Sequence, residues 1–230
     1  MKLHNAVVLI TGANRGIGLA FAEAALTRGA RKVYAGARDP SRISLAGVDP
    51  LKLDVTSDGD VAAAASACRD VTLVVNNAGI AHTGGILAAN GIDSTREHFE
   101  TNVIGVLRMM QAFAPILAAN GGGAFLNVLS VSSWINAGAM TAYGVSKAAA
   151  WNLTNGLRNE LRSQDTQVLA LHMGYVDTDM TKGLEVSKAS PQSIVKNAYD
   201  ALECGASEVL ADERSRLIKS GLTASSAVYL

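Results

Sequence analysis

The residues best suited to catalysis by type and spacing are a tyrosine and a lysine, Tyr143 and Lys147, four positions apart in a segment of helical pattern. Residues four apart on a helix share a face, about one turn from each other. A phenol is a weak acid with a pKa of about 10, and a nearby ammonium favours its phenolate form. The pair could therefore give and take a proton at neutral pH. Taken alone, the same spacing also fits an exposed pair without a function.

Polar residues elsewhere could support this pair. Ser130 stands thirteen positions before Tyr143, at the end of an apolar, β-branched run. Ser132 and Ser133 follow in the same loop, and either could take its place if that loop bulges. Asn102 falls inside a long helical pattern, although amide side chains favour caps and turns over helix interiors. These side chains are candidates to orient a substrate or a water molecule.

A glycine cluster, TGANRGIG at 11–18, follows the first apolar run and leads into a helical pattern. Gly12 would permit a tight turn, while Gly16 and Gly18 would let backbone and helix approach a pyrophosphate, whose charge a helix N-terminus favours. A tight turn in a protein that binds no nucleotide would also use glycine, so this motif alone is a weak signal. Its spacing is G-x-x-x-G-x-G, which departs from the commonest dinucleotide fingerprint.

In combination these motifs resemble the short-chain dehydrogenases/reductases. The resemblance extends from about Val7 to Met180 and includes TGANRGIG, NNAG at 76–79, Asn102, Ser130 and Tyr143-x-x-x-Lys147 in the family's usual order. It implies direct hydride transfer between a nicotinamide cofactor and a carbonyl carbon. By the same resemblance, Tyr143 would donate the proton, Ser130 would orient the substrate oxygen, and Lys147 would supply the ammonium and hold the nicotinamide ribose. Asn102 would kink its helix and hold a water beside the lysine.

The resemblance also implies a cofactor site. The last three residues of NNAG would stabilise the sheet beside the adenosine ribose, and Asp54 with Val55 would flank the adenine, although Asp54 could also be a cap or turn carboxylate. Val176 would meet the carboxamide and Thr178 the amide or pyrophosphate, in a loop that lacks the family's usual proline and its fixed φ. The predicted cofactor-binding residues are Gly12, Asn14, Arg15, Gly16, Ile17, Gly18, Arg38, Asp54, Val55, Asn77, Ala78, Gly79, Tyr143, Lys147, Val176 and Thr178.

The choice between NAD and NADP depends on the end of the strand expected at 32–37. An acid there would bind the ribose 2′-hydroxyl, whereas an arginine would suit a 2′-phosphate. Ala37 occupies the acid's position, Arg38 follows directly, and Arg15 lies in the glycine loop. Two guanidiniums can flank one phosphate with bidentate hydrogen bonds, so NADP(H) is the expected cofactor. Asp39 is the competing ribose acid, but a proline follows it, as in a turn.

The elements that position these residues follow from hydrophobic period. Short β-branched runs alternate with longer alanine-rich helical segments, which is typical of βαβ units around a parallel sheet. We expect an α/β fold, a doubly wound parallel sheet of about seven strands (Rossmann fold) with helices on both faces, in a single domain over 1–230. Strands are expected at 6–10, 32–37, 51–53, 72–76, 124–129, 168–172 and 208–210, and helices at 16–28, 95–119, 142–161 and, last, 191–202.

Composition excludes several classes of protein. Lysine plus arginine (20) equals aspartate plus glutamate (20), so no basic excess would bind nucleic acid. The apolar run at 6–10 is too short for a signal peptide or a membrane span, so we expect a cytoplasmic protein without a membrane partner. Two distant cysteines and four scattered histidines indicate neither a disulfide nor a metal site.

The helices expected at 95–119 and 142–161 form the main subunit contact in the family that the chain resembles. Both carry apolar residues beyond a single sheet-facing stripe, namely Ile104, Met109, Trp151, Leu153 and Leu157. We therefore expect a homodimer or homotetramer. A broader core is the alternative explanation.

In the family that the chain resembles, the segment corresponding to that between Thr178 and Pro191 folds over the substrate, and here it is short. We expect a pocket open on one side, which would accept apolar or aryl ketones and aldehydes. Its predicted walls are Trp134, Ile135, Met140, His82 and Met180. The alternative is that a partner's C-terminal tail, 227–230, closes the site.

Two other functions compete with a reductase. A sugar-nucleotide epimerase or dehydratase would use the same Tyr-Lys pair with NAD, but it needs a substantial substrate domain, and only residues 179–230 follow Thr178. A non-catalytic NADP-sensing protein would be expected to lose the serine, tyrosine or lysine, and all three are present.

Overall fold

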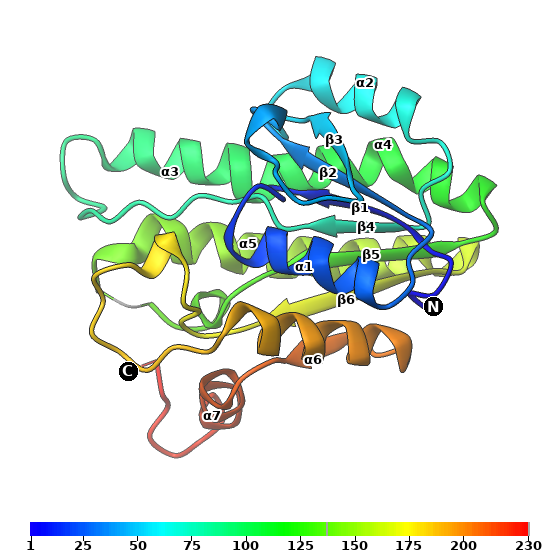
Figure 1. Cartoon of the computed structure of the whole chain (residues 1–230). Coiled ribbons are helices and arrows are strands. Elements are labelled where there is room, and N and C mark those ends of the chain that lie inside the picture. Colours follow the sequence, from blue (N-terminus) through cyan, green and yellow to red (C-terminus); the bar gives the residue numbers. More distant parts are fainter. Residues whose placement is uncertain (137, 230) are drawn as a thin grey trace.

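A parallel sheet organises the computed structural model, which describes residues 1–136 and 138–229. Its seven strands follow the order β3-β2-β1-β4-β5-β6-β7 (Figure 1). They are β1 (Val7–Thr11), β2 (Lys32–Ala37), β3 (Asp49–Lys52), β4 (Leu73–Asn76), β5 (Gly123–Val128), β6 (Thr166–His172) and β7 (Glu208–Leu210). The strand order reverses between β1 and β4, where doubly wound sheets bind their ligands. The predicted Rossmann fold is confirmed.

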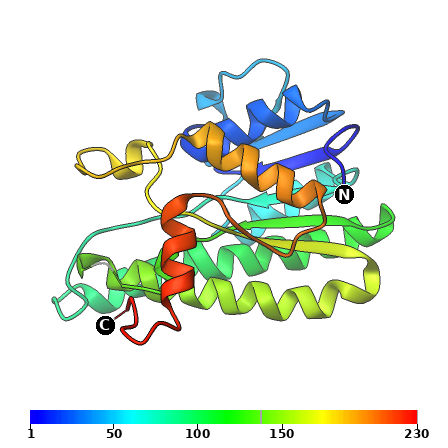
Figure 2. The same ribbon diagram turned by 90° about the horizontal axis from the view of Figure 1, so that it is seen from below.

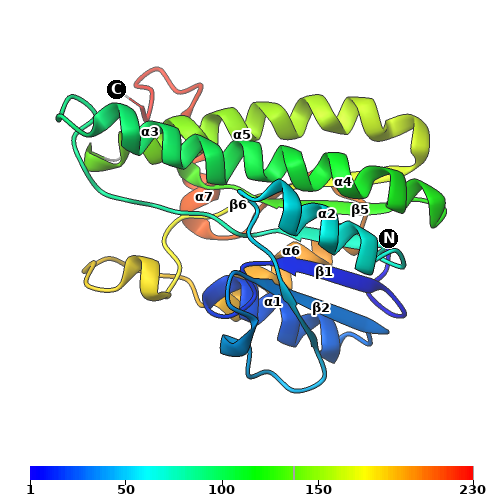
Figure 3. The same cartoon turned by 90° about the horizontal axis from the view of Figure 1, so that it is seen from above.

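Helices cover both faces of this sheet. On one face lie α1 (Gly16–Thr27) and α6 (Pro191–Glu203), which Figure 2 shows side by side. On the other lie α2 (Asp58–Ala67), α3 (Gly91–Phe99), α4 (Gly105–Ala119) and α5 (Thr141–Glu160), as Figure 3 shows. A short helix, α7 (Glu213–Gly221), packs beside β7.

The alternation of side chains along β1 explains the two-sided core. Val8 and Ile10 face the α1 and α6 layer, in a cluster that includes Tyr199, while Val7 and Leu9 join the cluster on the opposite face. These four side chains are completely buried, because a parallel sheet that helices cover on both faces has no face exposed to solvent.

The long helix predicted at 95–119 is interrupted. A π-helical segment, η2 (Glu100–Ile104), separates α3 from α4, and Asn102 lies within it. By length and composition Gly91–Ala119 could cross a membrane, but here it contributes to the core and packs against α5 and the sheet. Bulges of this kind often occur at functional sites.

A line of buried polar side chains runs through the centre of the molecule. Asn76 and Asn127 are register partners on β4 and β5, and the Asn76 amide donates to Asn127 Oδ1 at 2.8 Å. The Asn127 amide in turn donates to Thr154 Oγ1 on α5 at 3.0 Å. These hydrogen bonds join three elements that contribute to the cleft described below.

Two helices were not predicted, and the expectation that the helix at Pro191 is the last one is wrong. α2 begins at Ser57, whose hydroxyl accepts from the Asp60 amide. α7 begins with a capping box, in which Asp212 Oδ1 accepts from the Ser215 amide and the Ser215 hydroxyl accepts from the Asp212 amide. Both segments lack a strong apolar stripe, so hydrophobic period alone missed them.

The apolar residues expected on a subunit interface occupy different places. Met109 is 0% exposed and belongs to the core, whereas Ile104 is 38% exposed. Trp151, Leu153 and Leu157 are half-buried and pack against core clusters. The broader-core explanation therefore holds for Met109.

Candidate active site

A cleft of about 1330 Å³ opens at the carboxyl ends of the central strands. Every predicted cofactor-binding residue lines it, and so do Ser130, Tyr143 and Lys147. Asn102 does not reach the cleft wall; it lies behind it, 1% exposed. Thus motifs that are far apart in the sequence meet around one cavity.

Backbone geometry explains two of the glycines in the turn between β1 and α1. Gly12 and Gly16 have φ values of +68° and +56°, in the left-handed region that favours glycine. Gly18 has a different reason: a Cβ there would lie 2.1 Å from the Gly12 carbonyl oxygen. Gly18 therefore lets α1 approach its own turn, and it also lines the cleft.

Asn77 joins this turn to the end of β4. Its side-chain amide donates to the carbonyls of Thr11 and Gly12, at 2.9 and 3.2 Å. The Thr11 hydroxyl accepts from the main-chain amides of Asn77 and Ala78. The NNAG segment thus holds the two strands at the switch point together.

The N-terminus of α1 faces the cleft beside Arg15. Within the described residues no side chain caps this helix end, so its amides are available to an anionic ligand. Arg15 itself forms an ion pair with Asp179 at 2.9 Å, across the cleft. Arg38, its expected partner around a 2′-phosphate, lines the same cleft.

Arginines gather at the far end of the cleft, near β2. Arg38 and Arg42 both line it, and neither forms an ion pair within the part of the chain described. Asp39 accepts hydrogen bonds from the Ser41 amide and hydroxyl and caps a 3₁₀ turn, as expected of a turn residue. Arg42 was missed because it lies five residues beyond the end of β2.

Asp54 is a turn carboxylate on the same wall. It accepts hydrogen bonds from the Thr56 amide and hydroxyl at 2.9 and 2.8 Å. Burial raises its pKa, but these bonds and the nearby Arg38 and Arg108 guanidiniums outweigh burial, so the pKa of Asp54 is lowered. The carboxylate is therefore ionised at neutral pH and available to a ligand beside it.

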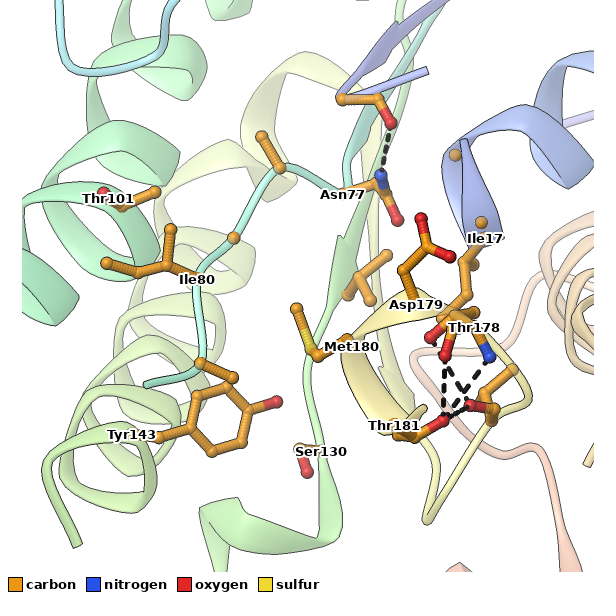
Figure 4. Close-up of a pocket in the computed structure, with 18 of the residues that line it drawn as sticks. Ile17, Asn77, Ile80, Thr101, Ser130, Tyr143, Thr178, Asp179, Met180 and Thr181 are labelled. Atoms are coloured by element: carbon orange, nitrogen blue, oxygen red, sulfur yellow. Dashed lines mark hydrogen bonds between the residues drawn. The ribbon is translucent and has the colours of Figure 1, made fainter. Parts of the chain in front are cut away.

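Tyr143 and Ser130 face the other end of the cleft. Figure 4 shows Tyr143 on α5 and Ser130 after β5 on one side of the cavity, Thr178 and Asp179 on the other, and Met180 between them. Burial raises the pKa of the Tyr143 phenol, and hydrogen bonding with the Ser130 hydroxyl opposes this rise. The phenol is thus protonated at neutral pH.

The three serines of the loop after β5 take different positions. Ser130 Oγ accepts from the Ser132 amide at 3.1 Å, so its own hydrogen can be donated to Tyr143 or to a ligand in the cleft. Ser132 also lines the cleft, whereas Ser133 is buried away from it. Ser130 is the one whose hydroxyl interacts with Tyr143.

Lys147 lies one turn along α5 from Tyr143. It is 6% exposed, and its Nζ donates to the Val128 carbonyl at 2.9 Å and stands 5.7 Å from the Tyr143 ring centre. Burial lowers the pKa of Lys147 to about 8. The ammonium is therefore present at neutral pH, close to the phenol.

Asn102 connects the π-helical segment to this pair. Its side chain exchanges hydrogen bonds with both main-chain groups of Ile80, at 2.9 and 3.0 Å, and donates to Ser146 Oγ at 3.0 Å. Ser146 in turn donates to the Tyr143 carbonyl at 2.7 Å. Asn102 thus positions the strand exit that forms one wall of the cleft.

The loop after β6 is held from outside. The Gly174 amide donates to Asp212 Oδ2 at 2.7 Å, and the loop is closed further on by a bridge between Val176 and Ala189. This contact with the start of α7 restrains the loop although the usual proline is absent. Val176 and Thr178 both line the cleft.

The predicted substrate walls are partly correct. Ile135, Met140, His82 and Met180 line the cleft. Trp134 does not: its half-buried ring stacks on the buried His172, with ring centres 4.1 Å apart. Residues that the sequence analysis missed are Tyr175 and Arg214, which line the cleft from the loop after β6 and from α7.

Comparisons with known proteins show that the chain is similar to short-chain dehydrogenases. Residues 6–189 match the family profile described as short chain dehydrogenase. A short chain dehydrogenase from Burkholderia cenocepacia J2315, solved in complex with NADP, is 39% identical, with 98% of this chain and 95% of that chain covered and a TM-score of 0.93. A short-chain dehydrogenase/reductase of Pestalotiopsis microspora is 34% identical, over 85% of this chain and 69% of its own length.

A more distant structure bears on the cofactor. A short chain dehydrogenase/reductase from Burkholderia phymatum, solved with NAD, is 24% identical, covers 96% of this chain and 95% of its own, and has a TM-score of 0.83. At this identity it shows the fold alone. Similar folds thus hold either nicotinamide dinucleotide.

Proposed function

The chain belongs to the short-chain dehydrogenase family of oxidoreductases, and from this membership we propose that it is an NADPH-dependent carbonyl reductase. The observation that carries the proposal is the convergence of Ser130, Tyr143 and Lys147 on the cleft that contains the β1–α1 glycine turn. A carbonyl group beside Tyr143 would then lie in the same cavity as a dinucleotide bound on that turn.

The cleft fits such a cofactor. The uncapped N-terminus of α1 and the backbone of Gly16 offer amides to a pyrophosphate. Arg38 and Arg42, which form no ion pair within the described part of the chain, offer two guanidiniums to a 2′-phosphate near Asp54. This pair replaces the expected combination of Arg38 with Arg15, because Arg15 is held by Asp179.

The bound nicotinamide would supply the hydride that goes to the carbonyl carbon. Tyr143 donates its phenolic proton to the carbonyl oxygen, and Ser130 orients that oxygen through its hydroxyl hydrogen. The Lys147 ammonium stabilises the phenolate that remains. Asn102 positions the Ile80 backbone beside these groups.

The arm at 179–190 supports a broad substrate range. It contains one short 3₁₀ turn, η6 (Asp179–Thr181), and its apolar side chains Met180, Leu184 and Val186 are exposed. In Figures 2 and 3 it projects away from the sheet. We infer a pocket open on that side, suited to apolar or aryl ketones and aldehydes.

We also propose a domain organisation, a cellular location and an oligomeric state. We take residues 1–230 as a single cytoplasmic domain that forms a homodimer or homotetramer through α4 and α5. Ile104, at the end of η2 just before α4, and Val145, on α5, are large apolar residues that are exposed there. The tail of this chain folds back on α7, where the Val228 amide donates to the Gly221 carbonyl; Leu230 lies outside the described residues. Sedimentation of a monomer at micromolar concentration would refute the oligomer.

The decisive experiment is a panel of ketones and aldehydes assayed by loss of NADPH absorbance, with NADH in parallel. We expect turnover of several apolar or aryl carbonyl compounds and a preference for NADPH. Preference for one small charged substrate over every aryl ketone by more than about a hundredfold, or about 2.7 kcal/mol, would overturn the open-pocket interpretation.

A further inference from the structure

Within the described residues Arg214 has no acidic partner at the substrate end of the cleft. It lies in the first turn of α7 and lines the cleft together with Ser130 and Tyr143. Within residues 1–136 and 138–229 it forms no ion pair and donates no hydrogen bond. Its positive charge therefore borders the cleft, although the proposed proton and hydride transfer assigns no role to it.

The side chain of Arg214 is held in place. Its guanidinium carbon stands 4.8 Å from the centre of the Tyr175 ring, in a cation–π contact. Its aliphatic part lies against Gly174, where a Cβ would come within 2.6 Å of Arg214 Cδ and 3.0 Å of Cβ. Gly174 does not have a positive φ, so the close approach of Arg214 is what excludes a side chain there.

The helix that carries Arg214 is fixed to the cleft as well. Both oxygens of Asp212 are occupied, one by the Ser215 amide and the other by the Gly174 amide, each at 2.7 Å. Asp212, two positions before Arg214, is therefore engaged by main-chain amides, and within the described residues the adjacent Glu213 forms no ion pair with Arg214. α7 also contacts the 3₁₀ turn Val131–Ser133, which follows Ser130 directly.

From these contacts we propose that Arg214 determines substrate specificity by binding a carboxylate at the far end of the carbonyl substrate. A planar guanidinium matches a carboxylate with two parallel hydrogen bonds, and Tyr175, which also lines the cleft, adds aromatic surface for an apolar or aryl body. The substrate class is thus an apolar or aryl ketone or aldehyde that also bears a carboxylate. This inference rests on the proposed carbonyl reductase function.

Matched pairs of aryl keto acids and their methyl esters, with one to four methylenes before the carboxylate, test the proposal. In the wild type, kcat/KM for the best keto acid should exceed that of its ester at least tenfold. Arg214→Gln should reduce this ratio at least tenfold, and Arg214→Lys should reduce it less, because a lysine keeps the charge but not the two-pronged geometry.

Arg216→Gln is the matched control. Arg216 lies on the same helix, donates to the Leu210 carbonyl at 3.1 Å and does not line the cleft. The acid-to-ester ratio of this variant should equal that of the wild type. An unchanged ratio in Arg214→Gln, or a wild type that prefers the esters, would overturn the proposal.

Calorimetric binding of the same pairs to the protein with NADP⁺ separates the two hypotheses. If the keto acids bind more tightly than the esters in an Arg214-dependent manner but no compound is reduced, the carboxylate site stands and the reductase function fails. If the compounds are reduced with no preference for the acid, the reductase function stands and the carboxylate site fails.

Discussion

His172 Nδ1 lies 3.2 Å from the main-chain oxygen of Ser130. This contact connects β6 to the residue just before the 3₁₀ turn Val131–Ser133. Within the described residues His172 Nε2 has no hydrogen-bond partner, so Nδ1 carries the hydrogen and the ring is neutral. Burial lowers the pKa of His172 to about 4, although Glu208 lies 3.5 Å away.

This burial makes stability dependent on acid pH. The folded pKa of His172 lies below its usual value of 6.5, so the unfolded chain takes up the proton first as the pH falls. The contribution to the free energy of unfolding is complete above about pH 6.5 and is lost toward pH 4, by up to about 3 kcal/mol. Urea unfolding of wild type and His172→Asn, from pH 7 to 4.5, should give a steeper loss for the wild type. His4→Asn, at an exposed site, is the control. Parallel slopes for wild type and His172→Asn would contradict the expectation.

Tyr143→Phe should reduce kcat by about 10²- to 10⁴-fold, because it removes the proton and keeps the ring. NADPH binding, followed by fluorescence, should stay within a few fold of the wild type. Lys147→Ala should lower both turnover and binding. Near wild-type turnover by Tyr143→Phe would rule out the proposed proton donor.

Cofactor preference should depend on Arg38, assisted by Arg42. In Arg38→Asp the KM for NADPH should rise by about 10- to 100-fold, as the 2′-phosphate loses charge-assisted hydrogen bonds, and NADH should become the preferred cofactor. Arg31→Asp, an exposed change before the start of β2, is the matched control. Equal kcat/KM for NADH and NADPH in the wild type would refute the NADPH assignment.

Lys147→Met should stabilise the protein at pH 7, because burying the Lys147 ammonium on folding costs free energy. The folded pKa of about 8 lies below the usual 10.5, so the folded protein loses the proton first as the pH rises. Wild-type stability therefore increases relative to the variant between pH 7 and 9.5, by about 1–2 kcal/mol. Urea unfolding at both pH values measures the gap. A gap that is constant with pH would mean that the lysine is not buried as a cation.

Gly18→Ala should disrupt the β1–α1 turn, because its Cβ would overlap the Gly12 carbonyl oxygen. We expect loss of NADPH binding and a lower melting temperature. Gly59→Ala, in α2 where the nearest atom to a Cβ is 3.9 Å away, should be neutral or slightly stabilising. Tight NADPH binding by Gly18→Ala would show that the turn tolerates a side chain.

Local sequence signals were sufficient for the sheet and for the cleft residues that sit at strand ends. Parallel strands are marked by β-branched runs, and Gly12 and Gly16 mark a turn that needs positive φ. The cap of α7 was also readable, as Asp212 followed three residues later by Ser215. It was missed because the helix has no clear apolar stripe.

Side-chain direction and long-range pairing could not be predicted from local pattern. Trp134 was expected in a pocket wall, but it turns inward because His172, on another strand, offers a flat partner. The partner of Arg15, Asp179, is 164 positions away, and only the folded chain brings them together. Local period contains no information about such contacts.

The buried line Asn76–Asn127–Thr154 has a consequence for how the active cleft is assembled. It joins β4, β5 and α5, the elements that lead to NNAG, to Ser130 and to the Tyr143–Lys147 pair. Sliding β4 or β5 by one residue would turn its side chains to the opposite face and leave the asparagine amides without partners in an apolar interior. The same hydrogen bonds that specify one strand register therefore also align the cleft residues that these three elements carry.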